Sequence, residues 1–482
     1  MTPEARSVPD VLADRYASAD LVRLWSSEHR VVLERRLWLA VLKAQAVQGL
    51  GVPAMAIRDY ERVVEQVDLT SISRRERVTR HDVKARIEEF NALAGHEHVH
   101  KALTGRDVGD NVEQFQIRLS LEHARDRTVA VLARLARLAA EHRTTVLVAR
   151  TRNVPAQATT LGKRFSTVAE ELLLAFERLE ALLGRYPLRG VKGAVGTGQD
   201  MLDLLGADLS ALAAVEHSVA EHLGFERVLT SVGQVYPRSL DYEVTSCLVQ
   251  LAAAPSSLAT TLRLMAGHDL ATEGFQPGQV GSSAMPHKMN PRTCERIHGL
   301  AVVLRGFAGM TAQLSGDQWN EGDVSCSVVR RVALPGAFFA YDGIVESCLT
   351  VLDEFHAFPE MIDRELERNI PFLATTKILT AAVRSGAGRE TAHRAIKENA
   401  VSSALALRET AVEPGDLLDG FTRALAADPR LPLPLDELND LLGDRHSFTG
   451  AADRQVRDIL RSLESVVARY RQAAEYEPEL IL

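Results

Sequence analysis

Aromatic residues and cysteines are scarce in this 482-residue sequence. Aromatics make up 5% of it, whereas hydrophobic residues as a whole make up 46%. Together with runs rich in Ala, Leu, Glu and Arg, this balance favours helices over sheets. The cysteines show no CxxC spacing, so we expect reduced core residues of a cytoplasmic protein and no zinc site. They are Cys247, Cys294, Cys326 and Cys348.

The sequence also lacks the features that bind nucleic acid or insert into membranes. The net charge is −8 and the pI is near 6.0. No basic tract with interleaved aromatic residues occurs, which argues against nucleic acid as a partner. The N-terminal residues lack the charged and apolar regions of a signal peptide, and apolar runs such as residues 300–304 are too short to span a bilayer. We therefore expect a cytoplasmic protein that attracts any anionic substrate through local Arg and Lys clusters.

Long stretches of helical periodicity dominate the middle of the chain. Residues 111–142 contain neither proline nor glycine, and their apolar residues repeat at helical spacing. At about 1.5 Å per residue this helix would be several tens of Å long. Since such helices cannot bury their apolar faces singly, we expect them to pack as a bundle. The other stretches of this kind are residues 155–183, 240–268, 291–314 and 327–355.

The chain is long enough for two or three domains. Residues 1–106 show helices of moderate length and predict an N-terminal helical domain. Residues 107–357 predict the central bundle of long helices. After Pro359 the helical patterns shorten and turn signals return, so residues 358–482 predict a C-terminal helical domain. The expected fold class is all-α with three domains.

The most unusual stretch is residues 281–291, GSSAMPHKMNP. Its two serines follow a glycine-rich approach, and Pro286 keeps the segment from being helical, so we expect a mobile loop. Asn290 is predicted to cap a helix that begins at Pro291, which would place exposed N–H groups and a helix dipole beside an anion. A serine acts as a base only if its alkoxide is stabilised, and Lys288 and these N–H groups are suitable stabilisers. The stretch therefore predicts a serine base beside an anionic substrate.

The pattern G-S-S-x-M-P-x-K-x-N resembles the signature of the fumarase/aspartase superfamily of fumarate-releasing lyases, and its flanks resemble the adenylosuccinate lyase branch. The resemblance covers essentially the whole chain. It implies that Ser282 removes a proton from Cβ of a succinyl group, with Ser283 as a further substrate-binding residue. Lys288 and Asn290 would hold the substrate carboxylate and the carbanion. It also implies a small anionic dicarboxylate substrate, no cofactor, and a homotetramer whose active sites are each shared between three chains.

The family builds its pocket from three segments, and residues 100–111, HKALTGRDVGDN, resemble the first of them, H-x-G-x-T-S-x-D-x-x-x-N. Thr104 and Asn111 match substrate-binding positions of the family. Gly105 replaces its serine, so either one hydroxyl donor is lost or the backbone N–H of Gly105 replaces it from a tight turn. Thr197 lies in a turn that resembles the family's K-G-x-x-G-T and would also face the substrate.

Residues 151–164, TRNVPAQATTLGKR, resemble the second segment, T/S-H-x-x-P-A-Q, in which the histidine is the general acid and the glutamine, here Gln157, binds substrate. Arg152 takes the place of the histidine, and arginine cannot deliver a proton near neutral pH. An amine leaving group needs a proton, whereas nitrite leaves as a weakly basic anion whose oxygens fit a guanidinium fork. We therefore predict a nitrosuccinate lyase-type enzyme in which Arg152 contacts the leaving group.

An ordinary adenylosuccinate lyase of purine nucleotide biosynthesis, which releases AMP and fumarate, is the close alternative. In it His81 or His100 would supply the proton. Several residues resemble the nucleotide-binding positions of adenylosuccinate lyases and support this alternative: Arg15, Tyr16, Arg80, His81, Ser327 and Arg331. More distant alternatives are a lyase that releases an acylated hydrazine and a non-catalytic scaffold. The retained serine, lysine and asparagine of the 281–291 stretch argue against the scaffold.

Three histidines, His96, His98 and His100, are spaced by two residues around Glu97 and raise the question of a metal site. Further carboxylate and cysteine partners are lacking nearby. We therefore expect no metal.

Overall fold

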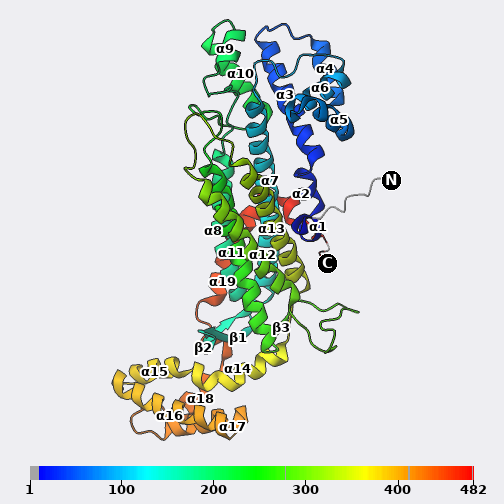
Figure 1. Ribbon diagram of the computed structural model, residues 1–482. Coiled ribbons are helices and arrows are strands. Elements are labelled where there is room, and N and C mark those ends of the chain that lie inside the picture. The colour runs from blue at the N-terminus through cyan, green and yellow to red at the C-terminus, as the bar shows by residue number, and fades with distance from the viewer. Residues whose placement is uncertain (1–9, 277, 411–412, 480, 482) are drawn as a thin grey trace.

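The computed structural model describes residues 10–276, 278–410, 413–479 and 481. Its long helices run side by side through the centre of the molecule (Figure 1), with α12 packed along both α11 and α13 and with α7 packed along α8 and α13. The predicted all-α fold is confirmed, and its core is the inside of this bundle. The helices are α7 (Gly105–Glu141), α8 (Leu161–Arg185), α11 (Ser239–Gly267), α12 (Arg292–Leu314) and α13 (Ser327–Glu354).

The predicted helix over residues 155–183 is wrong at its beginning. Strand β2 (Val154–Thr160) pairs there with strand β1 (Val146–Thr151) in an antiparallel hairpin. Helix α8 begins only at Leu161, where the Thr160 side chain caps it by accepting the N–H of Lys163. A β-hairpin needs a turn with positive φ, and the two residues at its tip provide it. The segment is short, and the spacing of apolar residues in a short segment does not distinguish a strand from the first turn of a helix.

Helix α7 begins earlier than the predicted residue 111. Thr104 and Asp107 form a capping box, in which each side chain accepts from the backbone N–H of the other residue. This cap starts the helix at Gly105. The helix is 37 residues long, which corresponds to about 55 Å.

Among the residues that the structure describes, one helix, α13, is long and apolar enough to cross a membrane, with a mean hydropathy of 1.2. Of its most apolar window 89% is buried inside the molecule. It is therefore the central core helix of the bundle, where its phenylalanines and small residues pack against α7, α11 and α12.

The N-terminal helices cover one end and one side of the bundle. Helix α3 packs on α7 and α10, and α4 to α6 form a compact group beside it (Figure 1). Helices α9 and α10 belong to the same end although they follow α8 in the chain. These elements are α1 (Val11–Arg15), α2 (Ala19–Leu24), α3 (Ser27–Val47), α4 (Ala54–Val63), α5 (Leu69–Thr79), α6 (Asp82–Ala94), α9 (Gln199–Leu204) and α10 (Leu209–His222).

At the opposite end a group of shorter helices has its own apolar core, which also includes Val146 and Val148 of β1. A short pairing of β3 (Ala271–Thr272) with β4 (His356–Ala357) lies where the chain leaves the bundle for these helices. The helices are α14 (Pro359–Leu373), α15 (Thr375–Arg384), α16 (Arg389–Glu409), α17 (Pro414–Ala426) and α18 (Leu435–Gly443).

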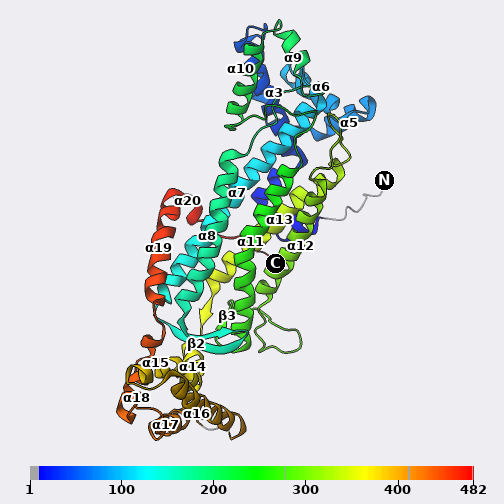
Figure 2. The same cartoon turned by 90° about the vertical axis from the view of Figure 1, so that its left-hand side faces the viewer.

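The last part of the predicted C-terminal domain, residues 358–482, does not pack with the other helices of that domain. After a 3₁₀ turn (Arg445–Phe448), helices α19 (Ala452–Arg469) and α20 (Arg471–Ala474) return to the bundle (Figure 2), where α19 packs along α7 and α8. Val456, Leu463 and Val466 of α19 belong to the bundle core. Sequence could show that α19 is amphipathic but not which apolar surface it covers.

Candidate active site

The stretch of residues 281–291 forms a loop between β3 and α12, and its two ends are tied together. The side-chain amide of Asn290 donates to the carbonyl oxygen of Gly281 at 2.9 Å. Gly281 also lies against the backbone of Lys288, where an added Cβ would come within 2.1 Å of the carbonyl oxygen. Only glycine fits this close approach. Asn290 therefore closes the loop and does not cap α12, contrary to the sequence prediction.

Ser282 is held in the environment that a serine base requires. Its Oγ accepts hydrogen bonds from the backbone N–H groups of Ala284, at 3.3 Å, and Met285, at 3.1 Å. Both donors favour the negatively charged form of the oxygen. Ser282 is partly buried, whereas its neighbour Ser283 is exposed. The local fold thus distinguishes the two adjacent hydroxyls.

The beginning of α12 is not an open anion site, because the protein's own Glu273 occupies it. The Glu273 carboxylate accepts the N–H groups of Thr293 and Cys294, both at 2.8 Å. Glu273 is 7% exposed, and the helix begins at Arg292 after Pro291 with no capping side chain of its own. The predicted substrate contact with this helix end is therefore wrong. Sequence analysis missed Glu273, which lies far before the helix that it caps.

We expect Glu273→Ala to destabilise the protein by about 0.5–2 kcal/mol, the usual contribution of a capping side chain. The reason is that two buried N–H groups at the start of α12 would lose their acceptor. Chemical denaturation monitored by circular dichroism would measure the change. Glu295→Ala is the matched control, since Glu295 lies in the first turn of the same helix but is exposed. Equal unfolding midpoints for the two variants would contradict the capping role.

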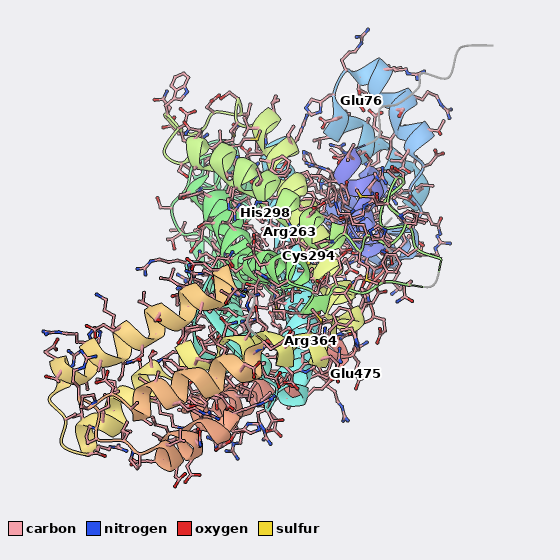
Figure 3. All side chains as sticks on the ribbon, turned by 90° about the horizontal axis from the view of Figure 1, so that it is seen from below. Glu76, Arg263, Cys294, His298, Arg364 and Glu475 are labelled. Atoms are coloured by element: carbon pink, nitrogen blue, oxygen red, sulfur yellow. The ribbon has the colours of Figure 1, made fainter. Side chains whose placement is uncertain are left out.

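Lys288 and His287 extend from the loop into solvent and line a cavity of about 640 Å³. Arg263 of α11, labelled in Figure 3, also lines this cavity. Within the described ranges, the side-chain amine of Lys288 makes no hydrogen bond or ion pair, so its charge is available to a carboxylate. Sequence analysis did not consider His287. The only signal for it was its position inside the 281–291 motif, directly before the lysine.

The first segment lies at the other end of the bundle. Asp107 is 1% exposed, and its Oδ1 accepts from the Arg189 guanidinium at 2.7 Å and from two backbone N–H groups at 3.0 Å. Thr104 uses its hydroxyl in the capping box and is partly buried. Gly105 is the first residue of α7 and not a tight turn, since its φ is not positive. Asp107 thus holds the segment to the chain around Gly193.

Asn111 does not fit the predicted substrate contact. It is 0% exposed, and its amide nitrogen donates to the carbonyl oxygens of Asp107 and Gly190 at 2.7 and 2.9 Å. Its side-chain oxygen accepts the Gly190 N–H at 2.9 Å. Because both ends of the amide are bonded to backbone, Asn111 joins α7 to the turn that leads to the exposed Thr197. It positions the site and is not aimed at a ligand.

Two histidines at this end differ in their accessibility. His81 is exposed and caps α6, where its Nδ1 accepts the N–H of Lys84 at 3.3 Å. The neutral ring therefore carries its proton on Nε2, the outward-facing nitrogen, as assigned from this bond. His100 is partly buried, its Nδ1 accepts from the Trp38 indole at 3.2 Å, and burial lowers its pKa. His81 is the better placed proton donor of the two.

Arg152 lies at the tip of the β1–β2 hairpin. Arg152 and Asn153 have φ values of 52° and 60°, which make the two-residue turn, and both are exposed. Gln157 is exposed on β2, and its amide makes a long contact of 3.5 Å with the Thr376 hydroxyl. The guanidinium of Arg152 is therefore free to contact something outside this chain.

The residues that resemble nucleotide-binding positions lie along the bundle, and some of them lie near the end where α7 begins. The Ser327 hydroxyl accepts from Arg106 at 3.1 Å, which connects α13 to the start of α7. Arg331 is exposed and lines a cavity of about 270 Å³ with Arg30. Tyr16 is partly buried, and the guanidinium of Arg296 lies 5.9 Å from its ring centre. Arg15 and Arg80 are exposed at the ends of α1 and α5.

The three closely spaced histidines, His96, His98 and His100, are bonded to other groups of the protein. His96 bonds to Asp59 at 2.8 Å, and Nδ1 of His98 lies 3.0 Å from the Lys101 amine. No group of three or more His, Cys, Asp or Glu side chains that could hold a metal occurs among the described residues. The cysteines are buried, and burial raises the pKa of the Cys247 thiol to about 12.

One chain does not bring the three segments together. The 100–111 segment begins α7, and the hairpin with Arg152 follows its other end, so about 55 Å of helix separates them. The 281–291 loop lies near the hairpin end, since Met361 of α14 lines both its cavity and the cavity beside the hairpin. Serine and lysine thus lie near one end of the molecule, and Thr104 and His81 lie at the other (Figure 1).

Comparison with known proteins identifies related sequences and folds. A family model described as "Lyase" matches residues 17–306, and one described as "Adenylosuccinate lyase C-terminus" matches residues 371–459. Adenylosuccinate lyase from Saccharomyces cerevisiae is 32% identical over 466 residues, which is 95% of each chain. Adenylosuccinate lyase from Methanothermobacter thermautotrophicus is 32% identical over 463 residues, 92% of this chain and 97% of that one.

Solved structures share the fold. A 3-carboxy-cis,cis-muconate lactonizing enzyme from Pseudomonas putida superimposes with a TM-score of 0.80 at 19% identity, and the match covers 96% of this chain and 100% of the other. A fumarate lyase from Mesorhizobium sp. BNC1 gives a TM-score of 0.77 at 20% identity, over 93% and 98%. At this identity the likeness concerns the arrangement of helices alone.

Proposed function

Because this chain belongs to the adenylosuccinate lyase branch of the fumarase/aspartase superfamily, we propose that it cleaves adenylosuccinate to AMP and fumarate. The chain is a fumarate-releasing carbon–nitrogen lyase. The observation that carries the choice of substrate is the relationship to adenylosuccinate lyases along nearly the full length of the chain. These relatives favour adenylosuccinate over nitrosuccinate, which sequence analysis alone had preferred.

The loop supplies the base and the charge for the first step. Ser282, whose Oγ already accepts two N–H groups, takes the proton from Cβ of the succinyl group. The negative charge that develops spreads onto the adjacent carboxylate, where the unpaired Lys288 stabilises it. Asn290 acts indirectly, since its amide holds the loop closed around these two residues.

The second step expels the purine amine, and a proton must reach its nitrogen. Arg152 stays charged and cannot give one. A histidine gives up a proton only from its charged imidazolium form. His81 is exposed and its ring can take up a proton from solvent, whereas burial disfavours the charged form of His100 and lowers its pKa. We assign the proton donor to His81. The guanidinium at 152 then holds an oxygen-bearing group of the substrate.

Nitrosuccinate is a second substrate to test, and the exposed guanidinium of Arg152 is the observation in its favour. A nitro leaving group needs no proton, and its two oxygens match two parallel N–H donors. Fumarate release from purified protein should be followed separately with adenylosuccinate and with nitrosuccinate. Turnover of adenylosuccinate supports the proposed function. If the protein turns over nitrosuccinate and not adenylosuccinate, it is a nitrosuccinate lyase, and the proposed function is wrong.

We also propose that the active site is assembled from several copies of the chain in a homotetramer. The separation of Thr104 from the loop by the length of α7 supports this arrangement, since no bending of a packed helix brings its ends together. A neighbouring copy packed alongside in the opposite direction would place the first segment of one chain next to the loop of another.

Mixed oligomers test this arrangement directly. Ser282→Ala and Thr104→Asn chains are each expected to be inactive, and asparagine keeps a good capping side chain at 104. After the two are unfolded together and refolded, about one quarter of the sites should combine an intact serine with an intact threonine from different chains. Recovered fumarate release would be measured against each variant refolded alone. A mixture as inactive as its components would show that both residues come from one chain.

A further inference from the structure

A second cavity, of about 550 Å³, lies where the β1–β2 hairpin meets the C-terminal helices. Its walls come from the hairpin, the end of α11, α14 and α16, and Figure 3 marks Arg364 of α14 at this junction. None of the residues predicted to bind substrate lines it. We call it the hairpin cavity.

Positive charge dominates the hairpin cavity. Arg364 and Arg368 lie one turn apart on α14, and Arg408 faces them from the last turn of α16. All three side chains are exposed, and within the described ranges none of their guanidinium groups makes a hydrogen bond or an ion pair. Two like charges at i and i+4 repel each other in a helix. The arrangement therefore leaves three guanidinium groups directed at a common space without a counter-charge.

The acidic residues of α14 do not neutralise these arginines. Glu365, the one acidic residue in the cavity wall, is bonded to Arg150 of the hairpin. Asp363 and Glu367 both pair with Arg445, at 2.9 Å each. Glu365, Asp363 and Glu367 are thus each paired with another arginine, and within the described ranges no ion pair joins an acidic residue of α14 to Arg364 or Arg368.

Apolar side chains also line the cavity, beside the polar side chains of His268 and Asn369. Val154 and Pro155 of the hairpin form one side, and Phe372 and Leu407 form another. The volume lies within the range of small-molecule sites, which combine an apolar wall with a few placed polar groups. Guanidinium groups bind phosphate oxygens through paired N–H donors, and a planar base can stack against an aromatic ring or a proline.

We propose that the hairpin cavity binds a nucleoside polyphosphate, with the phosphates on Arg364, Arg368 and Arg408 and the base against the apolar wall. The cavity shares Met361 with the cavity under the 281–291 loop. A nucleotide bound there lies next to the floor of the catalytic loop, where it can change how that loop is held.

Isothermal titration of the whole protein with ATP tests the proposal. An Arg364→Gln, Arg368→Gln double variant should bind ATP at least tenfold more weakly than the unaltered protein. Arg394→Gln is the matched control, because Arg394 is an exposed arginine of α16 outside the cavity wall, and it should leave the affinity unchanged. Arg331→Gln, at a residue that resembles a nucleotide-binding position of adenylosuccinate lyases, should also keep this binding.

Two results would overturn the proposal. If the double variant binds ATP as tightly as the unaltered protein while Arg331→Gln loses this binding, ATP occupies the substrate site. If inorganic triphosphate binds as tightly as ATP, the apolar wall recognises no base. Because every measurement is of binding, failure here leaves the proposed lyase reaction standing, and failure of that reaction leaves this site standing.

Discussion

Ser282→Ala is expected to lower kcat for fumarate release by about 10²–10⁴, the usual contribution of a positioned general base. The alanine removes the only atom that receives the Cβ proton, whereas Lys288 and the loop closure by Asn290 remain in place. The backbone N–H groups of Ala284 and Met285 lose an acceptor, but they lie in an exposed loop where water can replace it. The fold and substrate binding should therefore be unchanged.

Steady-state kinetics with adenylosuccinate, together with a thermal unfolding curve, would measure both expectations. Ser283→Ala is the matched control, since Ser283 is the adjacent, exposed hydroxyl and accepts neither of the N–H groups that bind Ser282. It should keep kcat within a small factor of the unaltered enzyme and change mainly KM. If the two variants lose activity equally, or if Ser283→Ala loses more, the base has been assigned to the wrong serine.

His81→Asn is expected to lower kcat for adenylosuccinate by about 10²–10⁴, because the departing amine would lose its general acid. Asparagine is a good helix cap, so α6 keeps its acceptor for the Lys84 N–H. Turnover of nitrosuccinate, if present, should hardly change, since nitrite leaves without a proton. The ratio of the two rates therefore separates a proton-transfer role from a structural one, which would lower both.

The complementary variant is Arg152→His. A histidine at the hairpin tip offers a second acid, so in the His81→Asn background it should restore part of the adenylosuccinate activity. For nitrosuccinate it should reduce kcat/KM by about 10–100-fold, because a charge-assisted hydrogen bond contributes about 1.5–3 kcal/mol. If Arg152→His changes neither reaction, then Arg152 contacts neither leaving group, and its exposed position on the hairpin has another purpose.

The catalytic loop shows what local sequence can predict. Gly281, Ser282 and Lys288 lie within a few residues of each other, so their spacing alone indicates a mobile, non-helical loop with a serine and a positive charge. The two N–H groups that stabilise the serine oxygen also come from this loop. The long helices were predictable for the same reason, since apolar periodicity and the lack of breakers are local properties.

The predictions were wrong for side chains that can form hydrogen bonds with several different groups. Asn290 has a side chain suited to capping a helix, but its amide nitrogen donates to the carbonyl oxygen of Gly281, and the Glu273 carboxylate accepts the N–H groups at the start of the helix. Asn111 matches a ligand position, yet packing of α7 against the Gly190 turn uses its whole amide. Glu273 and Gly190 lie many residues away from the groups that they bind, and the periodicity of the sequence does not reveal such pairs.

The sequence by itself determined that this protein is helical and that residues 281–291 form a loop that carries a serine and a lysine, to which the proposed function assigns the chemistry. Only the tertiary structure decided that α19 returns to the bundle and that unpaired arginines gather beside the hairpin. It also decided that about 55 Å of α7 separates the parts of the site. The physical reason is that helix formation and loop closure depend on neighbouring residues, whereas burial, ion pairing and the joining of distant segments depend on which surfaces meet.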